Sequence, residues 1–159
     1  MAWFLPAPAT GSYVGVLLMK RRILLADDDE SVRKMVGRVL ESEDYDVILA
    51  RTGAEAIKKA LVGSPDLVLL DINMPDKDGW EAFKLIDRIL PLVPVIVITA
   101  RPDQQECAMR VGIDALMEKP LDLAVLLKTI RDLLDESDLE RVKRPKDPSS
   151  SSPCIAEGR

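Results

Sequence analysis

Acidic side chains, a hydroxyl group and a lysine follow the short apolar stretches of this chain. Asp27 and Asp28 come directly after one such stretch and Asp71 after another, whereas Thr99 and Lys119 follow two more. Two carboxylates about 4 Å apart repel each other by roughly 4 kcal/mol at an effective dielectric constant near 20. Three carboxylates in one place would therefore need a proton or a cation. Lys119 supplies one positive charge, and a hard divalent ion such as Mg²⁺, which prefers oxygen ligands, suits the remainder.

Carboxylates next to Mg²⁺ support one kind of covalent chemistry, the attack of a carboxylate oxygen on a phosphoryl group to form an acyl phosphate. A lysine and a hydroxyl, here Lys119 and Thr99, would stabilise the charge on the phosphoryl oxygens. The chain has neither a GxGxxG turn nor a GxxxxGK loop followed by Ser or Thr, so we expect no bound nucleotide. The sequence therefore predicts that the phosphoryl group arrives on another molecule.

The chain contains no histidine, which excludes several classes of site. Catalysis by Ser-His or Cys-His pairs, zinc bound through imidazole, and a role as a phosphohistidine carrier all require that side chain. The 159 residues suit a single domain with short extensions. With 22 basic against 27 acidic residues and a net charge of −5, the chain is also a poor candidate for direct binding to nucleic acid.

Two kinds of segment alternate along the chain and must position these polar residues. The first kind is short and continuously apolar, which is typical of strands buried on both faces of a parallel sheet: residues 23–26, 47–50, 67–70, 95–98 and 115–117. The second kind has apolar residues at helical spacing: residues 30–40, 54–61, 80–90, 102–111 and 121–134. Asp29 is the expected N-cap of the first helix. The alternation predicts an α/β domain in which ligands bind beyond the carboxyl ends of parallel strands.

The two ends of the chain differ in composition from the middle. Residues 1–20 are predicted to be an N-terminal extension, which is either disordered or, over residues 1–18, lies upstream of a true start at Met19. Its apolar stretch is interrupted, and the positive charges of Lys20, Arg21 and Arg22 come after that stretch, unlike in a signal peptide or a membrane span. Residues 21–135 hold the predicted domain, and residues 136–159, rich in charge, Pro and Ser, are predicted to be a flexible tail. Cys107 and Cys154 form no CxxC pair, so we expect a reducing, cytoplasmic setting.

Four segments, in order, carry a family resemblance: ILLADDDE, LVLLDINMPDKDGWE, VIVITA and MEKPL. Together they make residues 21–134 resemble the receiver domains of two-component response regulators, including the single-domain chemotaxis regulators. The resemblance implies a flavodoxin-like, doubly wound α/β fold, with a five-stranded parallel sheet of order 2-1-3-4-5 and five helices. It also implies a cis peptide bond between Lys119 and Pro120.

The resemblance implies a role for each acidic residue. Asp71 would be the phosphoacceptor. Mg²⁺ would be bound by Asp28, by Asp71 and by the backbone carbonyl of Asn73, with Asp27 as the supporting member of the acidic pair.

The phosphoryl group itself would contact residues that follow the last two strands. By resemblance, Thr99 and the neighbouring Ala100 would bind its oxygens, and Lys119 would pair with it. Many family members carry Tyr or Phe three residues before that lysine, a ring that moves inward as the Thr hydroxyl turns. Here the position is Leu116, so we expect a smaller or differently routed rearrangement. Arg101 is predicted to lie at the pocket rim and to modulate access of water or of the phosphodonor.

The resemblance implies a stand-alone receiver that is not an enzyme but assists its own phosphorylation and dephosphorylation. A histidine kinase or a histidine phosphotransfer protein would donate the phosphoryl group. A downstream protein would read the face formed by the fourth helix, fifth strand and fifth helix, without direct contact with nucleic acid or insertion into a membrane. Two alternatives stay open. One is an aspartate-dependent phosphohydrolase or phosphotransferase of small molecules, which Asn73, two residues after Asp71, disfavours. The other is a receiver-like protein that binds partners without phosphorylation.

Overall fold

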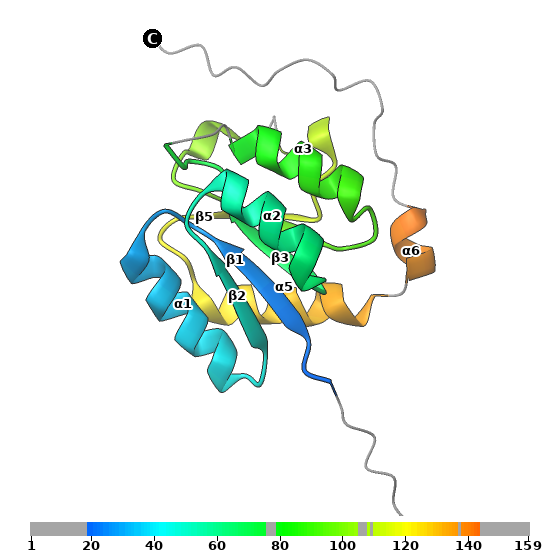
Figure 1. The fold of residues 1–159 in the computed structure, drawn as a ribbon, viewed down its shortest axis with the longest axis horizontal. Helices are drawn as coiled ribbons and strands as arrows, with labels where there is room; N and C mark the ends of the chain where they lie inside the picture. The colour runs from blue at the N-terminus through cyan, green and yellow to red at the C-terminus, as the bar shows by residue number, and fades with distance from the viewer. Residues whose placement is uncertain (1–18, 76–78, 105–107, 109, 137, 144–159) are drawn as a thin grey trace, which may run out of the picture.

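The computed structural model describes residues 19–75, 79–104, 108, 110–136 and 138–143. Its centre is one five-stranded parallel sheet (Figure 1). The strands are β1 Arg22–Ala26, β2 Asp46–Ala50, β3 Leu67–Asp71, β4 Val95–Thr99 and β5 Ala115–Glu118. Each contains the apolar segment predicted as a strand and adds one residue at one end. The sheet order β2-β1-β3-β4-β5 confirms the predicted flavodoxin-like topology.

Helices follow the strands at the predicted places. Those described in full are α1 Glu30–Ser42, α2 Gly53–Gly63, α3 Gly79–Ile89, α5 Leu123–Asp135 and α6 Asp138–Val142. The predicted fourth helix, 102–111, falls partly outside the described residues. Within it, Pro102–Gln104 form a 3-10 turn, and Ala108, Arg110 and Val111 are helical.

Alternate residues of each strand face opposite sides of the sheet, which divides the core into two layers. Leu24, Val68 and Leu70 belong to the layer shared with α2 and α3. Ile23 and Leu69 belong to the layer shared with α1 and α5. Figure 1 shows the same division, with α2 and α3 on one side of the sheet and α1 and α5 on the other. Because both faces are covered, the strands need the continuous apolar sequence from which they were predicted.

Side-chain caps start three of these helices. The Asp29 carboxylate accepts hydrogen bonds from the backbone N–H groups of Ser31 and Val32, which confirms the predicted cap of α1. Thr52 caps α2 and Asp122 caps α5 in the same way. Each cap satisfies backbone donors that have no partner within the helix. The caps thereby define where the loops beyond β1, β2 and β5 end.

A short helix, α6, lies in the segment that was predicted to be a flexible tail. Arg141 anchors it, because its Nη1 donates to the backbone oxygen of Leu92 at 2.6 Å and its Nη2 to the backbone oxygen of Leu133. Residues 138–142 of the predicted tail are therefore helical. The rest of the predicted tail, residues 144–159, and most of the predicted extension, residues 1–18, lie outside the described residues. Among the helices described, none has the length and apolar character to cross a membrane.

Candidate phosphoacceptor site

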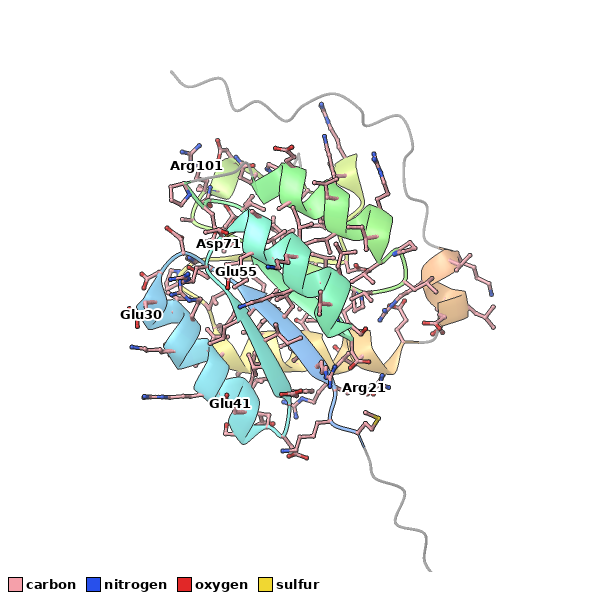
Figure 2. The ribbon with its side chains drawn as sticks, viewed as in Figure 1. Arg21, Glu30, Glu41, Glu55, Asp71 and Arg101 are labelled. Carbon is pink, nitrogen blue, oxygen red and sulfur yellow. The ribbon has the colours of Figure 1, made fainter. Side chains whose placement is uncertain are left out.

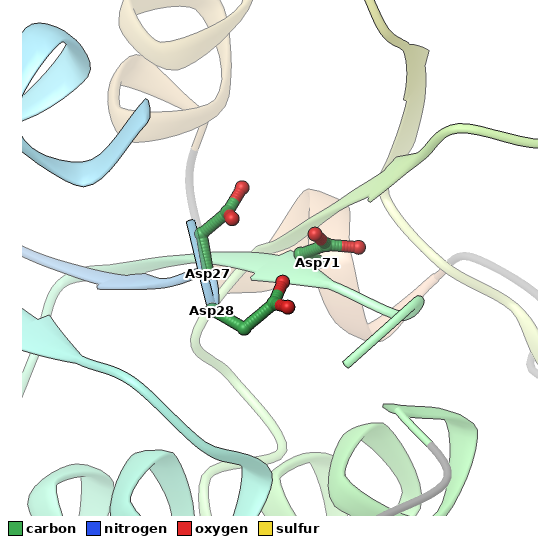
Figure 3. A group of neighbouring side chains, drawn as sticks. All are labelled: Asp27, Asp28 and Asp71. Atoms are coloured by element: carbon green, nitrogen blue, oxygen red, sulfur yellow. The ribbon is translucent and has the colours of Figure 1, made fainter. Parts of the chain in front are cut away.

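Three carboxylates meet beyond the carboxyl ends of β1 and β3 (Figure 3). Asp71 is the last residue of β3 and only 1% exposed, and Asp27, directly after β1, is fully buried. Asp28 is exposed. One oxygen from each of the three carboxylates lies within 4.8 Å of the others. The parallel pairing of β1 with β3, which sets Ala26 beside Leu70, brings these segments together although they are far apart in the chain.

Lys119 bridges two of these carboxylates. Its Nζ lies 2.8 Å from Asp71 Oδ2 and 2.8 Å from Asp27 Oδ2. The residue follows β5, and its backbone N–H donates to the backbone oxygen of Thr99 at 2.8 Å, so the strand pairing places the ammonium group over the site. The Lys119–Pro120 peptide bond is cis, the isomer that the resemblance implies.

The pKa values of Asp27 and Lys119 are both raised above their ordinary values, but for different reasons. Burial raises the pKa of the Asp27 carboxyl group, and the Lys119 ammonium and the Asp29 N–H oppose this without cancelling it. Burial lowers the pKa of Lys119, but the carboxylates of Asp27 and Asp71 outweigh it and leave that pKa above its ordinary value. Lys119 therefore carries its positive charge at neutral pH.

The donor set fits a hard divalent cation. All three side chains offer carboxylate oxygens, and Lys119 neutralises only one of the three negative charges. Asp27 Oδ2 is buried, and its contact with Lys119 Nζ at 2.8 Å is an ion pair. Oxygen ligands with excess negative charge are what Mg²⁺ binds, whereas zinc favours the imidazole and thiolate ligands that the described part of this site lacks.

A second polar cluster lies next to Asp71, at the end of β4. The backbone N–H of Asn73 donates to Asp71 Oδ1 at 2.7 Å. The side-chain oxygen of Asn73 accepts from the Thr99 hydroxyl at 3.0 Å and from the Ala100 N–H at 2.8 Å. Arg101 is exposed, and its N–H donates to Thr99 Oγ1 at 3.0 Å. Figure 2 shows the Asp71 and Arg101 labels toward one end of the sheet and Arg21 toward the other. The structure thus brings together all the residues predicted for phosphoryl binding.

Leu116 lies in β5 opposite Val97 of β4. It is partly buried and packs on the core layer under α2 and α3. Leu116 thus places an aliphatic side chain where many receiver domains have the aromatic ring of Tyr or Phe.

Sequence reasoning missed Arg33. This arginine is only 8% exposed, and its Nη1 donates to the backbone oxygens of Asp27 at 2.6 Å and of Asp28 at 2.8 Å. The buried guanidinium therefore holds the loop that presents the acidic pair, and its charge is satisfied by carbonyl groups. Its spacing in the sequence could have indicated its burial, because Arg33 lies three residues before Val36 and seven before Leu40 and so falls on the buried face of α1.

A buried hydrogen bond between Trp80 and Gln104 was also missed. Trp80 is 5% exposed, and its ring packs edge-on against that of Phe83 at a centroid distance of 6.2 Å. Its indole Nε1 also donates to Gln104 Oε1 at 2.8 Å. This bond ties the segment after Thr99 to the start of α3.

Comparison with known proteins agrees with this geometry. Residues 23–131 match the family described as the response regulator receiver domain. The transcriptional regulatory protein GlrR of Escherichia coli (strain K12) is 36% identical over 118 residues, which cover 72% of this chain and 26% of the relative. The regulatory protein PhoP of Bacillus subtilis (strain 168) is 32% identical over 123 residues, 76% of this chain and 51% of the relative. The chain thus spans about half of these relatives or less.

Solved structures are similar over nearly their whole length. A CheY-like receiver domain protein from Methanospirillum hungatei JF-1 is 30% identical, with a TM-score of 0.70 over 79% of this chain and 99% of that one. The response regulator TrrA from Thermotoga maritima, solved in complex with Mg²⁺ and BeF, is 30% identical, with a TM-score of 0.67 over 71% of this chain and 98% of that one. The family match, the fold and the strand-end site agree, and the chain belongs to the response regulator receiver domain family.

Proposed function

We propose that Asp71 accepts a phosphoryl group from the phosphohistidine of a histidine kinase or a histidine phosphotransfer protein, in a reaction that depends on Mg²⁺. The observation that carries this proposal is the position of the Asp71 carboxylate. It ends a buried strand beside two further carboxylates and lies 2.8 Å from the ammonium group of Lys119. The chain has no histidine of its own, so the donor histidine belongs to a partner.

The reaction is a balanced transfer between two side chains. A carboxylate oxygen of Asp71 forms a bond to phosphorus, the bond between phosphorus and the donor imidazole nitrogen breaks, and the imidazole keeps the electron pair. Asp28, Asp71 and the Asn73 carbonyl, supported by Asp27, would hold Mg²⁺. The ion, when bound, neutralises charge on the phosphoryl oxygens.

Three groups of this chain would hold the transferred phosphoryl group. Lys119 is charged at neutral pH and already sits on Asp71, so it can pair with a phosphoryl oxygen without an added proton. The Thr99 hydroxyl and the Ala100 N–H lie together at the end of β4, where both can donate to another oxygen. The similar TrrA structure, which contains Mg²⁺ and BeF, supports an ion and a phosphoryl-like group in this fold.

The phosphorylated domain would then signal through protein contacts. The segment after Thr99 leads towards the fourth predicted helix, and β5 and α5 follow it in the chain. We propose that this face carries the output. Leu116 makes the change there smaller than in relatives with an aromatic ring, because an aliphatic side chain has less volume to move.

Intact-mass measurement after incubation with phosphoramidate or acetyl phosphate and Mg²⁺ tests the proposal. We expect the wild-type chain to gain one phosphoryl group, and Asp71→Ala or removal of Mg²⁺ to abolish the gain. Asp103→Ala is a matched control, because it removes an exposed acid from the same end of β4 that is outside the carboxylate cluster. Steady release of phosphate from sugar phosphates would instead support a phosphohydrolase. A folded, unmodified wild-type chain would contradict phosphoacceptance.

A further inference from the structure

The side chain of Asn73 lies across the two donors that would bind the phosphoryl group. Its Oδ1 accepts from the Thr99 hydroxyl at 3.0 Å and from the Ala100 N–H at 2.8 Å. A backbone N–H can only donate, so the atom facing Ala100 must be the carboxamide oxygen. A neutral oxygen of this chain thus takes the place that an anionic phosphoryl oxygen needs.

Both donors are committed by this contact. The Thr99 hydroxyl has one proton and the Ala100 N–H has one, so neither can serve Asn73 and a phosphoryl oxygen at full strength together. Thr99 is fully buried, and its hydroxyl also accepts from the Arg101 N–H at 3.0 Å. The hydroxyl proton faces two acceptors, Asn73 Oδ1 at 3.0 Å and the backbone oxygen of Arg101 at 3.3 Å, and Asn73 is the nearer of the two.

The backbone of Asn73 is held separately from its side chain. Its N–H donates to Asp71 Oδ1 at 2.7 Å, which fixes the turn after β3. The residue is partly exposed, so the carboxamide can swing toward solvent while that turn stays in place. The side chain can therefore leave without disturbing the carboxylate cluster.

We propose that the Asn73 side chain is a built-in occupant of the phosphoryl-oxygen subsite, which must swing away before Thr99 and Ala100 bind the phosphoryl group. The inference rests on the proposed function and adds a competitor within the same site. Asn73 would then have two separate roles. Its backbone carbonyl would bind the metal ion, and its carboxamide would hold the Thr99 hydroxyl in place while Asp71 is unphosphorylated.

The competition has a measurable size. The apparent affinity of a ligand equals its affinity for the open site multiplied by the fraction of molecules in which that site is open. Two ordinary neutral hydrogen bonds favour the closed form by roughly tenfold after exchange with water. Removing the carboxamide should therefore tighten the binding of a phosphoryl analogue by about tenfold.

Titration with beryllofluoride at saturating Mg²⁺ tests this, with calorimetry as the readout on the full chain. Asn73→Ala removes the carboxamide, and Asn73→Leu also removes the acceptor but keeps a similar volume. We expect both variants to bind beryllofluoride about tenfold more tightly than wild type. Titration with Mg²⁺ alone measures separately what each substitution does at the metal site, and saturating Mg²⁺ keeps such a change out of the beryllofluoride affinity.

Amide spectra provide a second readout that does not need the analogue. Without anion, the Ala100 amide resonance should shift in both variants, because it loses its acceptor. Unchanged or weaker beryllofluoride affinity in both variants, with wild-type binding intact, would overturn the inference alone. A wild-type chain that binds no beryllofluoride with Mg²⁺ would overturn the proposed function and the inference with it.

Discussion

Replacing Gly79 with alanine would drive a methyl group into the backbone of the loop that follows Asp71. An ideal Cβ at this position would lie 2.2 Å from the Cα, 2.5 Å from the O and 2.7 Å from the C of Ile72. Nonbonded carbon atoms normally pack at about 3.5–4.0 Å, so the two segments would have to separate by more than about 1 Å. The obstacle is backbone on the Ile72 side, which cannot rotate out of the way as a side chain can.

The cost follows from this overlap. Overpacking in a core usually costs about 1–3 kcal/mol, and we expect Gly79→Ala to lie near the upper value because no side chain can give way. Gly37 is the matched control, since a Cβ there would meet Leu49 Cδ2 at an ordinary 3.6 Å inside helix α1. Gly37→Ala should therefore stabilise the protein by up to about 1 kcal/mol through helix propensity.

Two measurements check this prediction. Urea unfolding followed by circular dichroism should give a free energy of unfolding about 3 kcal/mol lower for Gly79→Ala and slightly higher for Gly37→Ala. The phosphorylation rate with phosphoramidate should fall by tenfold or more only in Gly79→Ala, because an Ångström displacement next to Asp71 spoils the geometry of attack. Equal stability of the two variants, or a Gly79→Ala variant with wild-type phosphorylation, would refute the reasoning.

Three further predictions concern the stability that Glu55 contributes, the access to the Asp71 site past Arg101, and the rearrangement of the proposed output face. Glu55 accepts from the Arg51 N–H and pairs with Lys59 at 2.6 Å, contacts that lower its pKa to about 2. Glu55→Gln should therefore cost about 1 kcal/mol at pH 7, and urea unfolding should show this difference shrinking only as the pH falls from about 4.5 toward 2. Arg101→Ala should change the rates of phosphorylation or dephosphorylation measured by intact mass, and unchanged rates would discard its role at the rim. Because position 116 is leucine, beryllofluoride with Mg²⁺ should cause only modest amide shifts over residues 102–130, and large shifts centred there would contradict this.

The strands and the carboxylate cluster were predictable because local sequence determines them. A continuous apolar run such as Leu67–Leu70 can only be buried on both faces, and parallel pairing then brings the ends of several strands to one edge. The Asp29 cap was predictable for the same reason, since its hydrogen bonds reach only the next residues in the chain.

The contacts that were missed join segments distant in sequence or contradict a residue's usual preference. Gln104 reaches Trp80 across 24 positions, and no local pattern signals that pairing. Arginine is rarely buried in proteins, and Arg33 is tolerated in the interior because two backbone carbonyls accept hydrogen bonds from it. The hydrogen bonds that the Asn73 side chain accepts from Thr99 and Ala100, and the anchoring of α6 by Arg141, depend likewise on the assembled fold.

Chemical identification of the modified residue tests the central claim most directly. Sodium borohydride reduces an aspartyl phosphate to homoserine, which peptide mass spectrometry can locate after treatment with phosphoramidate and Mg²⁺. The account predicts homoserine at position 71 in the wild-type chain and none anywhere in Asp71→Ala. Homoserine at another acidic residue, or a phosphoryl group that resists borohydride, would contradict Asp71 as the phosphoacceptor.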